Sequence, residues 1–299
     1  MTDIAPISLI DLEELARDHA KPVTDAIPTH LPQWNRACRD EGGGIGLAPG
    51  WFVVMAGKPG AGKTLMAINL LIAAMRANTM CCVLSYEMSK SQMLTRALAI
   101  ATGAGIHRLE RGPGYDAQTF REAIDVWDKD GLHYKMLLAE RPERTISVMQ
   151  THLLDAANYG CRLLIVDYTQ LVGRTEHPAI FERVQAVSGV LQQTAFETRC
   201  TVIGLSQFNR TTLANRKDEP GTEGLKGGSL DEDADQVVML DYSDAQKQLT
   251  SLTTNFIVGK NRHGPAPTIP IIFDYQTLRV RERTSYDEAV ERIRNKEGA

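Results

Sequence analysis

Residues 57–64 read Gly57-Lys58-Pro59-Gly60-Ala61-Gly62-Lys63-Thr64, which is the G-x-x-x-x-G-K-T pattern of a phosphate-binding loop. The apolar run at 51–56 predicts a buried strand before the loop, and the apolar residues at 65–72 predict a helix after it. A strand, a glycine-rich loop and a helix in this order direct backbone N–H groups and a helix N-terminus at phosphate oxygens. Lys63 is expected to reach the β- and γ-phosphates, and Thr64 to offer its hydroxyl to Mg²⁺. We therefore predict a nucleoside triphosphate site, in preference to an ordinary glycine turn.

The composition is typical of a globular protein with a sizeable core. The 299 residues are 43% hydrophobic and 23% charged, which allows one large α/β domain or two small ones. The formal net charge is −4, so contact with a nucleic acid requires a local basic site rather than a global positive field. We expect a cytoplasmic protein without a membrane anchor, because the sequence has no signal peptide and no long apolar stretch. The cysteines lack metal-ligand spacing and are expected to be reduced core thiols: Cys38, Cys81, Cys82, Cys161 and Cys200.

Apolar runs that alternate with helical periodicity predict an α/β fold. We expect a mostly parallel sheet that helices cover on both faces, with a β-hairpin near the C-terminus. Further strands are expected at 80–85, 133–138, 162–167, 201–206 and 236–240, and the hairpin strands at 252–259 and 269–281. Helices are expected at 89–101, 116–129, 145–158 and 180–198, with a polar helix from residue 286 onward.

The chain divides into three predicted parts. Residues 1–44 are expected to form an N-terminal helix and linker, residues 45–282 the main α/β domain, and residues 283–299 a C-terminal helical tail. Apolar residues at helical spacing mark residues 8–16 as an amphipathic helix, and three prolines mark the linker. A lone amphipathic helix cannot bury its apolar stripe by itself, so it docks either on its own domain or on a neighbouring molecule.

Polar side chains stand where three predicted strands end, which is where open α/β sheets carry their chemistry. Asp167 ends the strand at 162–167 and can hold Mg²⁺, with a helix cap as the alternative. Glu87 follows the strand at 80–85 and can activate an attacking water, unless it is an ordinary surface glutamate. Gln207 follows the strand at 201–206 and can bond a γ-phosphate, unless it is a plain loop glutamine.

Two cations, Lys260 and Arg262, follow the first hairpin strand. Positive charge at this place can stabilise a phosphoryl group during its transfer. A solvated turn is the alternative that the residues alone leave open.

The order of these motifs resembles that of the C-terminal motor domain of the DnaB-type replicative helicases, over roughly residues 45–282. The resemblance is carried by the phosphate loop and by Ser85-Tyr86-Glu87-Met88, Leu164-Ile165-Val166-Asp167-Tyr168, Ser206-Gln207, Asp233-Ala234-Asp235 and Gly259-Lys260-Asn261-Arg262. It implies a RecA-like fold and a ring, usually a hexamer, with ATP between subunits and single-stranded DNA in the pore. It also implies ATP-driven DNA unwinding with 5′-to-3′ polarity.

The same resemblance implies roles for individual residues. Lys63 and Thr64 correspond to the phosphate and Mg²⁺ residues, and Glu87 corresponds to the catalytic base. Asp167 corresponds to the Walker-B acid, and Gln207 to the link between the γ-phosphate and the DNA loop.

Lys260 and Arg262 correspond to groups that the family supplies to the ATP of the next subunit, with Arg262 as the arginine finger. The DNA-facing loop of the family is matched by Leu225-Lys226-Gly227-Gly228-Ser229, which is one residue shorter. We expect contacts to the DNA backbone, insensitive to sequence, from Arg210, Lys226, Gly227 and Gly228.

The resemblance does not include the family's N-terminal domain, which binds primase in the cellular enzymes. The chain therefore resembles a phage or plasmid form, for which we expect a helicase loader or another replication protein as partner rather than primase. Two other functions remain open: a RecA-like ATPase that loads or remodels DNA-bound complexes without unwinding, and a small-molecule phosphotransferase. The late Lys-x-Arg pair and the long polar segment at 207–230 argue against the phosphotransferase.

Overall fold

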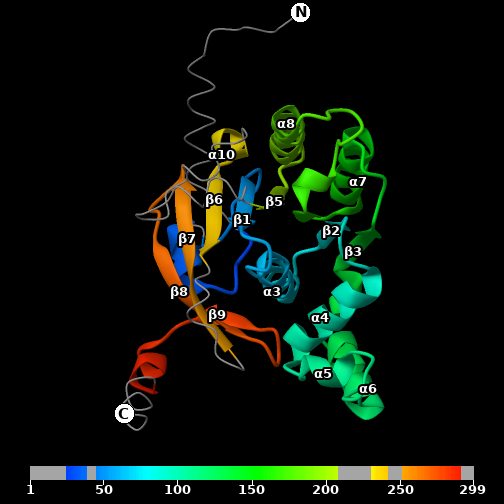
Figure 1. The fold of residues 1–299 in the computed structure, drawn as a ribbon, viewed down its shortest axis with the longest axis vertical. Coiled ribbons are helices and arrows are strands. Elements are labelled where there is room, and N and C mark those ends of the chain that lie inside the picture. The colour runs from blue at the N-terminus through cyan, green and yellow to red at the C-terminus, as the bar shows by residue number, and fades with distance from the viewer. Residues whose placement is uncertain (1–24, 39–44, 208–229, 242–250, 291–299) are drawn as a thin grey trace, which may run out of the picture.

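The protein is built on one nine-stranded sheet, in a computed structural model that describes residues 25–38, 45–207, 230–241 and 251–290. The strands are β1 Phe52–Gly57, β2 Cys81–Ser85, β3 Met136–Glu140, β4 Leu163–Asp167, β5 Thr201–Gln207, β6 Gln236–Asp241, β7 Ser251–Asn261, β8 Thr268–Asp274 and β9 Val280–Glu282. They lie in the order β3-β2-β4-β5-β1-β6-β7-β8-β9 (Figure 1). Neighbours from β3 to β6 are parallel, and neighbours from β6 to β9 are antiparallel. The predicted mostly parallel sheet with a C-terminal hairpin is confirmed.

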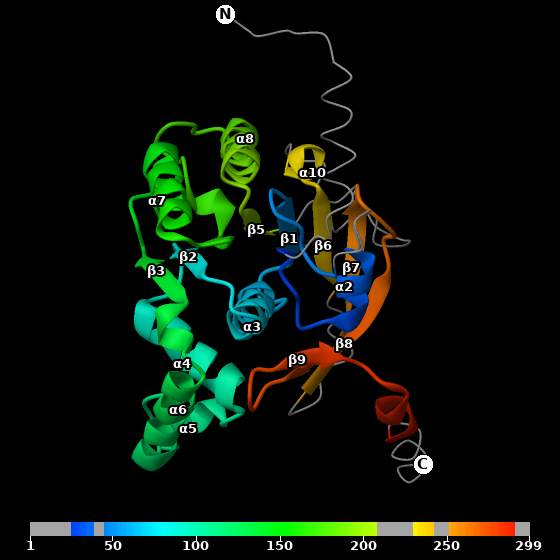
Figure 2. The same ribbon diagram turned by 180° about the vertical axis from the view of Figure 1, so that it is seen from behind.

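Helices cover both faces of the sheet, as the view from behind also shows (Figure 2). They are α2 Pro32–Ala37, α3 Lys63–Arg76, α4 Lys90–Thr102, α5 Ile106–Leu109, α6 Ala117–Lys129, α7 Ile146–Tyr159, α8 Ile180–Thr198 and α10 Leu230–Asp233. Successive residues of a strand point to opposite faces. Val53 and Met55 of β1 accordingly belong to the core beneath α3 and α4, whereas Phe52 and Val54 belong to the core beneath α7 and α8.

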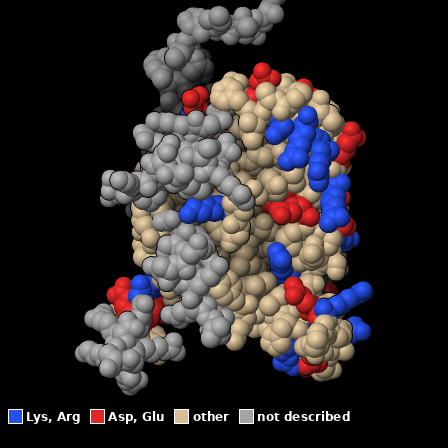
Figure 3. Space-filling view, viewed as in Figure 1, with Lys and Arg blue, Asp and Glu red and all other residues tan. Residues whose placement is uncertain are grey.

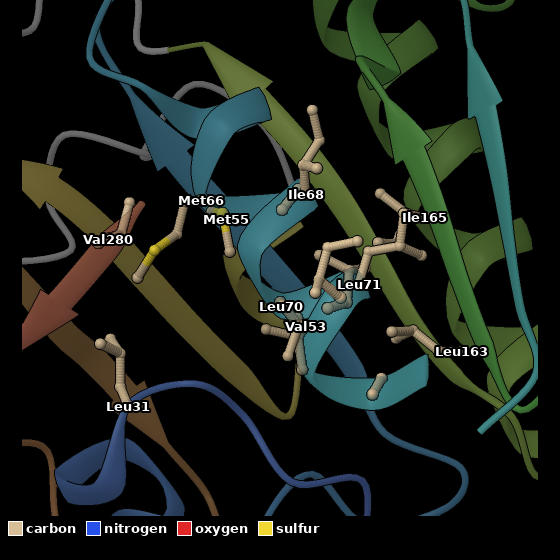
Figure 4. Packing of buried hydrophobic residues seen from close by; sticks show 14 of the residues in the cluster. Leu31, Val53, Met55, Met66, Ile68, Leu70, Leu71, Leu163, Ile165 and Val280 are labelled. Carbon is tan, nitrogen blue, oxygen red and sulfur yellow. The ribbon is translucent and has the colours of Figure 1, made fainter. Parts of the chain in front are cut away.

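The helix that follows the phosphate loop is held by its buried side. Leu70 and Leu71 of α3 are fully buried, and Figure 4 shows them among Val53 of β1 and Ile165 of β4. A buried leucine of this kind stabilises the fold by about 2 kcal/mol relative to an exposed one. This packing fixes the N-terminal end of α3, and with it the loop, against the edge of the sheet.

The ends of the helices follow from local sequence. Ser89 caps α4 and forms a capping box with Gln92, while Asp116 and Thr145 cap α6 and α7 through side-chain bonds to free backbone N–H groups. The fourth long helix, α8, spans Ile180–Thr198 as predicted. The predicted helices after residue 80 are therefore confirmed.

Part of the predicted linker lies in the folded core. Ile27, Leu31 and Trp34 are at most 2% exposed. The indole N–H of Trp34 donates a hydrogen bond of 2.7 Å to the side-chain oxygen of Gln236, 202 residues away. Residues 25–38 thus differ from the linker prediction, because they bury apolar side chains against strands that are distant in sequence. The helix predicted at residues 8–16 lies outside the described residues.

Two predicted strands differ in their bounds. A 3₁₀ turn, Leu132–Tyr134, occupies the start of the strand predicted at 133–138, so β3 begins at Met136. The strand predicted at 269–281 is divided into β8 and β9. Asp274 ends β8, and its Oδ1 accepts a hydrogen bond of 2.8 Å from the N–H of Gln276, which turns the chain.

The C-terminal tail begins with a helix at residues 285–290, near the predicted start at 286. Among the helices that the structure describes, none combines the length and the apolar character needed to cross a bilayer.

Candidate nucleotide-binding site

Parallel pairing brings the ends of several strands to one edge of the sheet. Gly57 at the end of β1 lies beside Gln207 at the end of β5, and Ser85 at the end of β2 lies beside Asp167 at the end of β4. Glu87 follows two residues after the end of β2. The structure therefore places the phosphate loop and all three predicted strand-end residues on the same edge.

The phosphate loop, residues 57–64, requires glycine at positions with left-handed backbone. Gly60 and Gly62 have φ angles of +77° and +89°. A Cβ at Gly62 would also lie 2.9 Å from a ring carbon of Phe273. Gly62 is the N-cap of α3 and makes no side-chain bond, so the first N–H groups of this helix open toward the exposed tip of the loop at Pro59. Free N–H groups at a helix N-terminus bind phosphate oxygens.

Lys63 folds its side chain back onto the loop. Its ammonium group donates hydrogen bonds of 3.0 Å to the carbonyls of Gly57 and Lys58, and the N–H of Ala61 donates one of 3.1 Å to the same Lys58 carbonyl. The side chain of Lys63 is buried, and this burial lowers its pKa, with nearby carboxylates acting in the opposite sense. A bound phosphate would offer this buried cation the anionic partner that two neutral carbonyls cannot.

Thr64 and Asp167 meet beneath the loop. The Thr64 hydroxyl donates a hydrogen bond of 2.8 Å to Oδ2 of Asp167, whose side chain is 2% exposed. Burial raises the pKa of Asp167 to about 6, and the charge of Glu87 adds to the increase. The hydrogen bond from Thr64 and the charges of Lys63 and Arg96 act in the opposite sense.

The chemistry of this pair fits Mg²⁺. A hydroxyl and a carboxylate oxygen lie together in a buried place, and a hard cation prefers oxygen ligands. The structure contains no group of three or more His, Cys, Asp or Glu side chains suited to a metal ion among the residues that it describes. A cation here would therefore complete its coordination with water or with oxygens of a nucleotide, as Mg²⁺ commonly does.

Glu87 is exposed, whereas its neighbours Tyr86 and Met88 are buried. The hydroxyl of Ser85 donates to the Met88 carbonyl at 2.9 Å and accepts from the Met88 N–H at 3.2 Å, which closes a tight turn. The Tyr86 N–H donates to the carbonyl of Asp167 at 2.8 Å. The backbone of Glu87 is thus fixed to the end of β4, and its carboxylate is presented at the edge of the sheet.

Three arginines that the sequence analysis missed lie beside this turn. Arg141 and Arg144 each donate to a carbonyl at 3.4 Å, those of Glu87 and Tyr86 respectively, and Arg96 lies near enough to Asp167 to affect its pKa. In the space-filling view, Lys and Arg side chains gather on the side of the molecule where α7 and α8 lie (Figure 3). No spacing in the sequence separates these arginines from ordinary surface arginines, so only the fold identifies them.

Gln207 is held by a residue that the sequence analysis did not single out. The side-chain oxygen of Gln170 accepts from the Gln207 N–H at 3.3 Å, and its side-chain N–H₂ donates to the Gln207 carbonyl at 3.1 Å. The same N–H₂ donates to the Ser206 hydroxyl at 2.6 Å. The position of Gln170, three residues after Asp167, was the available signal.

Lys260 and Arg262 lie at the opposite edge of the sheet. Lys260 pairs with Val237 of β6, and the Arg262 N–H donates to the carbonyl of Asp235, which in turn is bonded to Phe52 at the start of β1. The phosphate loop begins at the other end of β1, roughly 16 Å away for a strand of this length. The structure therefore does not bring these two cations to the phosphate loop of their own chain.

The geometry of the β6–β7 pair also shapes this corner. The register shifts between Val237 and Val238, which face Lys260 and Val258, so Gly259 is an extra residue in β7. A bulge of this kind re-aims the side chain that follows. Both cations end on one acceptor, because the Lys260 ammonium and the Arg262 guanidinium donate to the carbonyl of Glu232 at 3.1 and 2.6 Å.

The four predicted DNA contacts, Arg210, Lys226, Gly227 and Gly228, lie outside the described residues. Their role stays a prediction.

Comparison with known proteins identifies relatives of this chain. The family model described as the DnaB-like helicase C-terminal domain matches residues 41–282. The chain is 27% identical to the replicative DNA helicase DnaB of Buchnera aphidicola subsp. Baizongia pistaciae, over 91% of this chain and 58% of that protein. It is 31% identical to the DnaB of Pasteurella multocida, over 78% and 52%, and 27% identical to a probable plasmid replicative DNA helicase of Chlamydia trachomatis, over 77% and 50%. The chain spans about half the length of the curated relatives that it matches.

Solved structures share the fold. The structure of a DnaB-like replicative helicase, described with its interactions with primase, superposes with a TM-score of 0.75 at 18% identity, covering 94% of this chain and 68% of that one. A second solved structure, of an isolated ATPase domain, superposes with a TM-score of 0.76 at 18% identity, covering 92% and 97%. The RecA-like fold predicted from the sequence is confirmed, and the chain belongs to the family of the DnaB-like helicase C-terminal domain.

Proposed function

We propose that this chain is the motor of a ring-forming DNA helicase, a hexamer that uses ATP to move 5′-to-3′ along single-stranded DNA during replication. The family match and the names of the relatives support a helicase, and the strand-end site supports the use of a nucleotide. The polarity and the number of subunits come from the resemblance to the family.

One observation carries the proposal of a ring. The phosphate loop and Arg262 lie at opposite ends of β1, so a single chain cannot place Arg262 on its own nucleotide. A head-to-tail contact between copies joins one edge of a subunit to the opposite edge of the next, and such contacts close into rings. The ATP site would then be completed by the Lys260 and Arg262 of a neighbouring subunit.

The ligands of the site are ATP and Mg²⁺. Residues Gly57 to Thr64 would surround the phosphates with backbone N–H groups, and Lys63 would exchange its two carbonyl partners for phosphate oxygens. Thr64 and Asp167 would hold Mg²⁺, directly or through water. The ion, when bound, supplies positive charge to the phosphate oxygens and screens the buried Asp167 carboxylate.

Hydrolysis would use residues of two subunits. Glu87, fixed by its turn and exposed at the edge, would accept a proton from the attacking water. Arg262 and Lys260 of the neighbour would stabilise the charge that develops on the transferred phosphoryl group. Gln207 would bond the γ-phosphate and pass its presence to the segment that follows it, where Arg210, Lys226, Gly227 and Gly228 would contact the DNA backbone.

Partners and compartment follow from the same proposal. Beyond single-stranded DNA and further copies of itself, a helicase loader or another replication protein is the expected partner. The five cysteines are buried and unbonded, which agrees with a reducing compartment such as the cytoplasm.

Two measurements test the proposal. The mass of the purified protein, with and without ATP, should show a ring rather than a monomer, and a monomer under both conditions would contradict the site between subunits. ATP-dependent separation of a forked DNA duplex should then accompany hydrolysis. Binding of the fork without strand separation would instead favour an ATPase that loads or remodels DNA-bound complexes.

A further inference from the structure

Asp235 joins the start of β1 to the residue that follows β7. Its N–H donates to the Phe52 carbonyl at 2.9 Å, and its Oδ2 accepts from the Phe52 N–H at 2.9 Å. Its carbonyl accepts from the Arg262 N–H at 3.0 Å. The backbone of Arg262 is therefore tied, through one residue, to the strand that carries the phosphate loop at its other end.

The second carboxylate oxygen of Asp235 faces the side chains beyond β7. Its Oδ1 lies 3.8 Å from Nη1 of Arg262 and 3.3 Å from Nε2 of His263. The His263 ring stacks on Trp51, with centroids 4.4 Å apart and planes 14° from parallel. The other guanidinium nitrogen, Nη2 of Arg262, donates to the Glu232 carbonyl at 2.6 Å. The guanidinium thus has a carboxylate on one side and a carbonyl on the other.

We infer that Asp235 is a positioning residue for Arg262, which sets the direction of its guanidinium toward the nucleotide of the adjacent subunit. The inference rests on the proposed role of Arg262 between subunits. Asp235 itself stands at the far end of β1 from Gly57, so it takes no part in the nucleotide site of its own chain.

The charge of Asp235 matters for direction more than for folding. The side chains of Arg262 and Asp235 are 44% and 20% exposed, and an ion pair of this exposure and length contributes little to stability. An arginine side chain loses considerable rotamer freedom when it is ordered, and a fixed carboxylate reduces that loss before the nucleotide binds. Loss of the charge should therefore lower the rate of hydrolysis while the fold persists.

The first experiment uses Asp235→Asn, which keeps an oxygen for the Phe52 N–H but removes the charge. We expect kcat for ATP hydrolysis to fall about tenfold, with the KM for ATP and the thermal midpoint of unfolding unchanged. Asp130→Asn is the matched control, because it removes the aspartate of another half-exposed pair, with Arg76 at 3.2 Å, on a distant surface. The control should hydrolyse ATP like the wild-type protein.

The second experiment mixes variants within one ring and separates positioning from general damage. In an equal mixture of Asp235→Asn with Glu87→Gln, about a quarter of the interfaces would join an intact Glu87 to an Arg262 that retains its Asp235. ATPase activity should then exceed that of either parent. In a mixture with Arg262→Ala, both lesions lie on the same side of the interface, so activity should fall between the two parents.

The outcomes distinguish this inference from the proposed function. A mixture of Arg262→Ala with Glu87→Gln, with subunit exchange confirmed, is measured first. Failure to regain activity there contradicts the role of Arg262 between subunits, and the inference fails with it. If that mixture regains activity but Asp235→Asn regains it with both partners or with neither, Asp235 does not act through Arg262. Unchanged kcat in Asp235→Asn overturns the inference directly.

Discussion

The hydroxyl of Thr64 donates a hydrogen bond of 2.8 Å to Oδ2 of Asp167, and this bond links the phosphate loop to the end of β4 across the intervening strand β5. The bond does not compensate the carboxylate for its burial, because the pKa of Asp167 is still raised to about 6. A buried carboxylate of this kind destabilises the folded protein when it is ionised. It is tolerable where a cation binds, and this supports the proposed Mg²⁺ site.

Replacement of Asp167 by asparagine should stabilise the protein while it abolishes hydrolysis. Between the ordinary aspartate pKa of 3.8 and the folded value of about 6, the folded protein binds more protons than the unfolded chain. The free energy of unfolding of the wild-type protein therefore falls as pH rises through this window, by about 3 kcal/mol at most. Asp167→Asn should lose this fall and should be more stable than wild type at pH 7 without Mg²⁺. Denaturant unfolding at pH 4 and pH 7 measures both, and equal pH dependence in the two proteins would contradict the raised pKa.

The fold could be predicted largely because its signals are local. A short apolar run that ends in a polar residue identified β2, β4 and β5, and capping residues such as Ser89 identified the helix starts. The segment around Trp34 could not be recognised, because its partner Gln236 is 202 residues away and nothing near Trp34 in the sequence specifies that contact. Proline-rich sequence there has the composition of a linker but the packing of a core.

The candidate site was predictable to the extent that it depends on strand ends. Glu87, Asp167 and Gln207 share one edge because parallel strands end together, which is a property of the sheet rather than of the residues. The sequence does not specify where a late hairpin ends relative to that edge, so the position of Arg262 at the opposite end of β1 required the structure. The roles assigned to these residues stay predictions.

Glu87→Gln should separate binding of ATP from its hydrolysis. The amide keeps the shape of the side chain, and the turn formed by Ser85 and Met88 does not involve the carboxylate. ATP should bind with unchanged affinity while turnover falls about a hundredfold or more, since the proton acceptor is lost. Glu122→Gln on the exposed face of α6 is a control for the same chemical change. A fall in turnover of less than about threefold would rule out Glu87 as the base.

Arg210 and Lys226 should affect DNA binding through charge alone. If each contacts a phosphate, replacement of either by alanine should weaken binding of single-stranded DNA to a similar degree for all sequences. The slope of log affinity against log salt concentration should become shallower by about one unit, because one fewer counterion is released. Fluorescence anisotropy at several salt concentrations measures the slope. A slope identical to that of wild type would place these side chains away from the strand.

The last prediction concerns the side chain of Gln170, which bonds both the N–H and the carbonyl of Gln207. If Gln207 reports the γ-phosphate to the DNA-contacting segment that follows it, its backbone must keep a fixed position when that segment moves. Gln170→Leu retains most of the side-chain volume but removes both hydrogen bonds. DNA should then no longer stimulate ATP hydrolysis, whereas turnover without DNA should change less than about threefold.

The control for Gln170→Leu is Gln193→Leu, which removes an exposed bond of 2.7 Å to Glu197 within α8 and touches no strand end. Both variants should bind ATP with the affinity of the wild-type protein. Gln170→Leu should also lower the free energy of unfolding by about 1–3 kcal/mol, because two backbone groups of a partly buried strand end lose their partners. Loss of stability alone, with full stimulation by DNA, would mean that Gln170 supports the end of β5 but does not connect the nucleotide to DNA. Loss of stimulation in Gln170→Leu and not in Gln193→Leu would place the connection at the contact between Gln170 and Gln207.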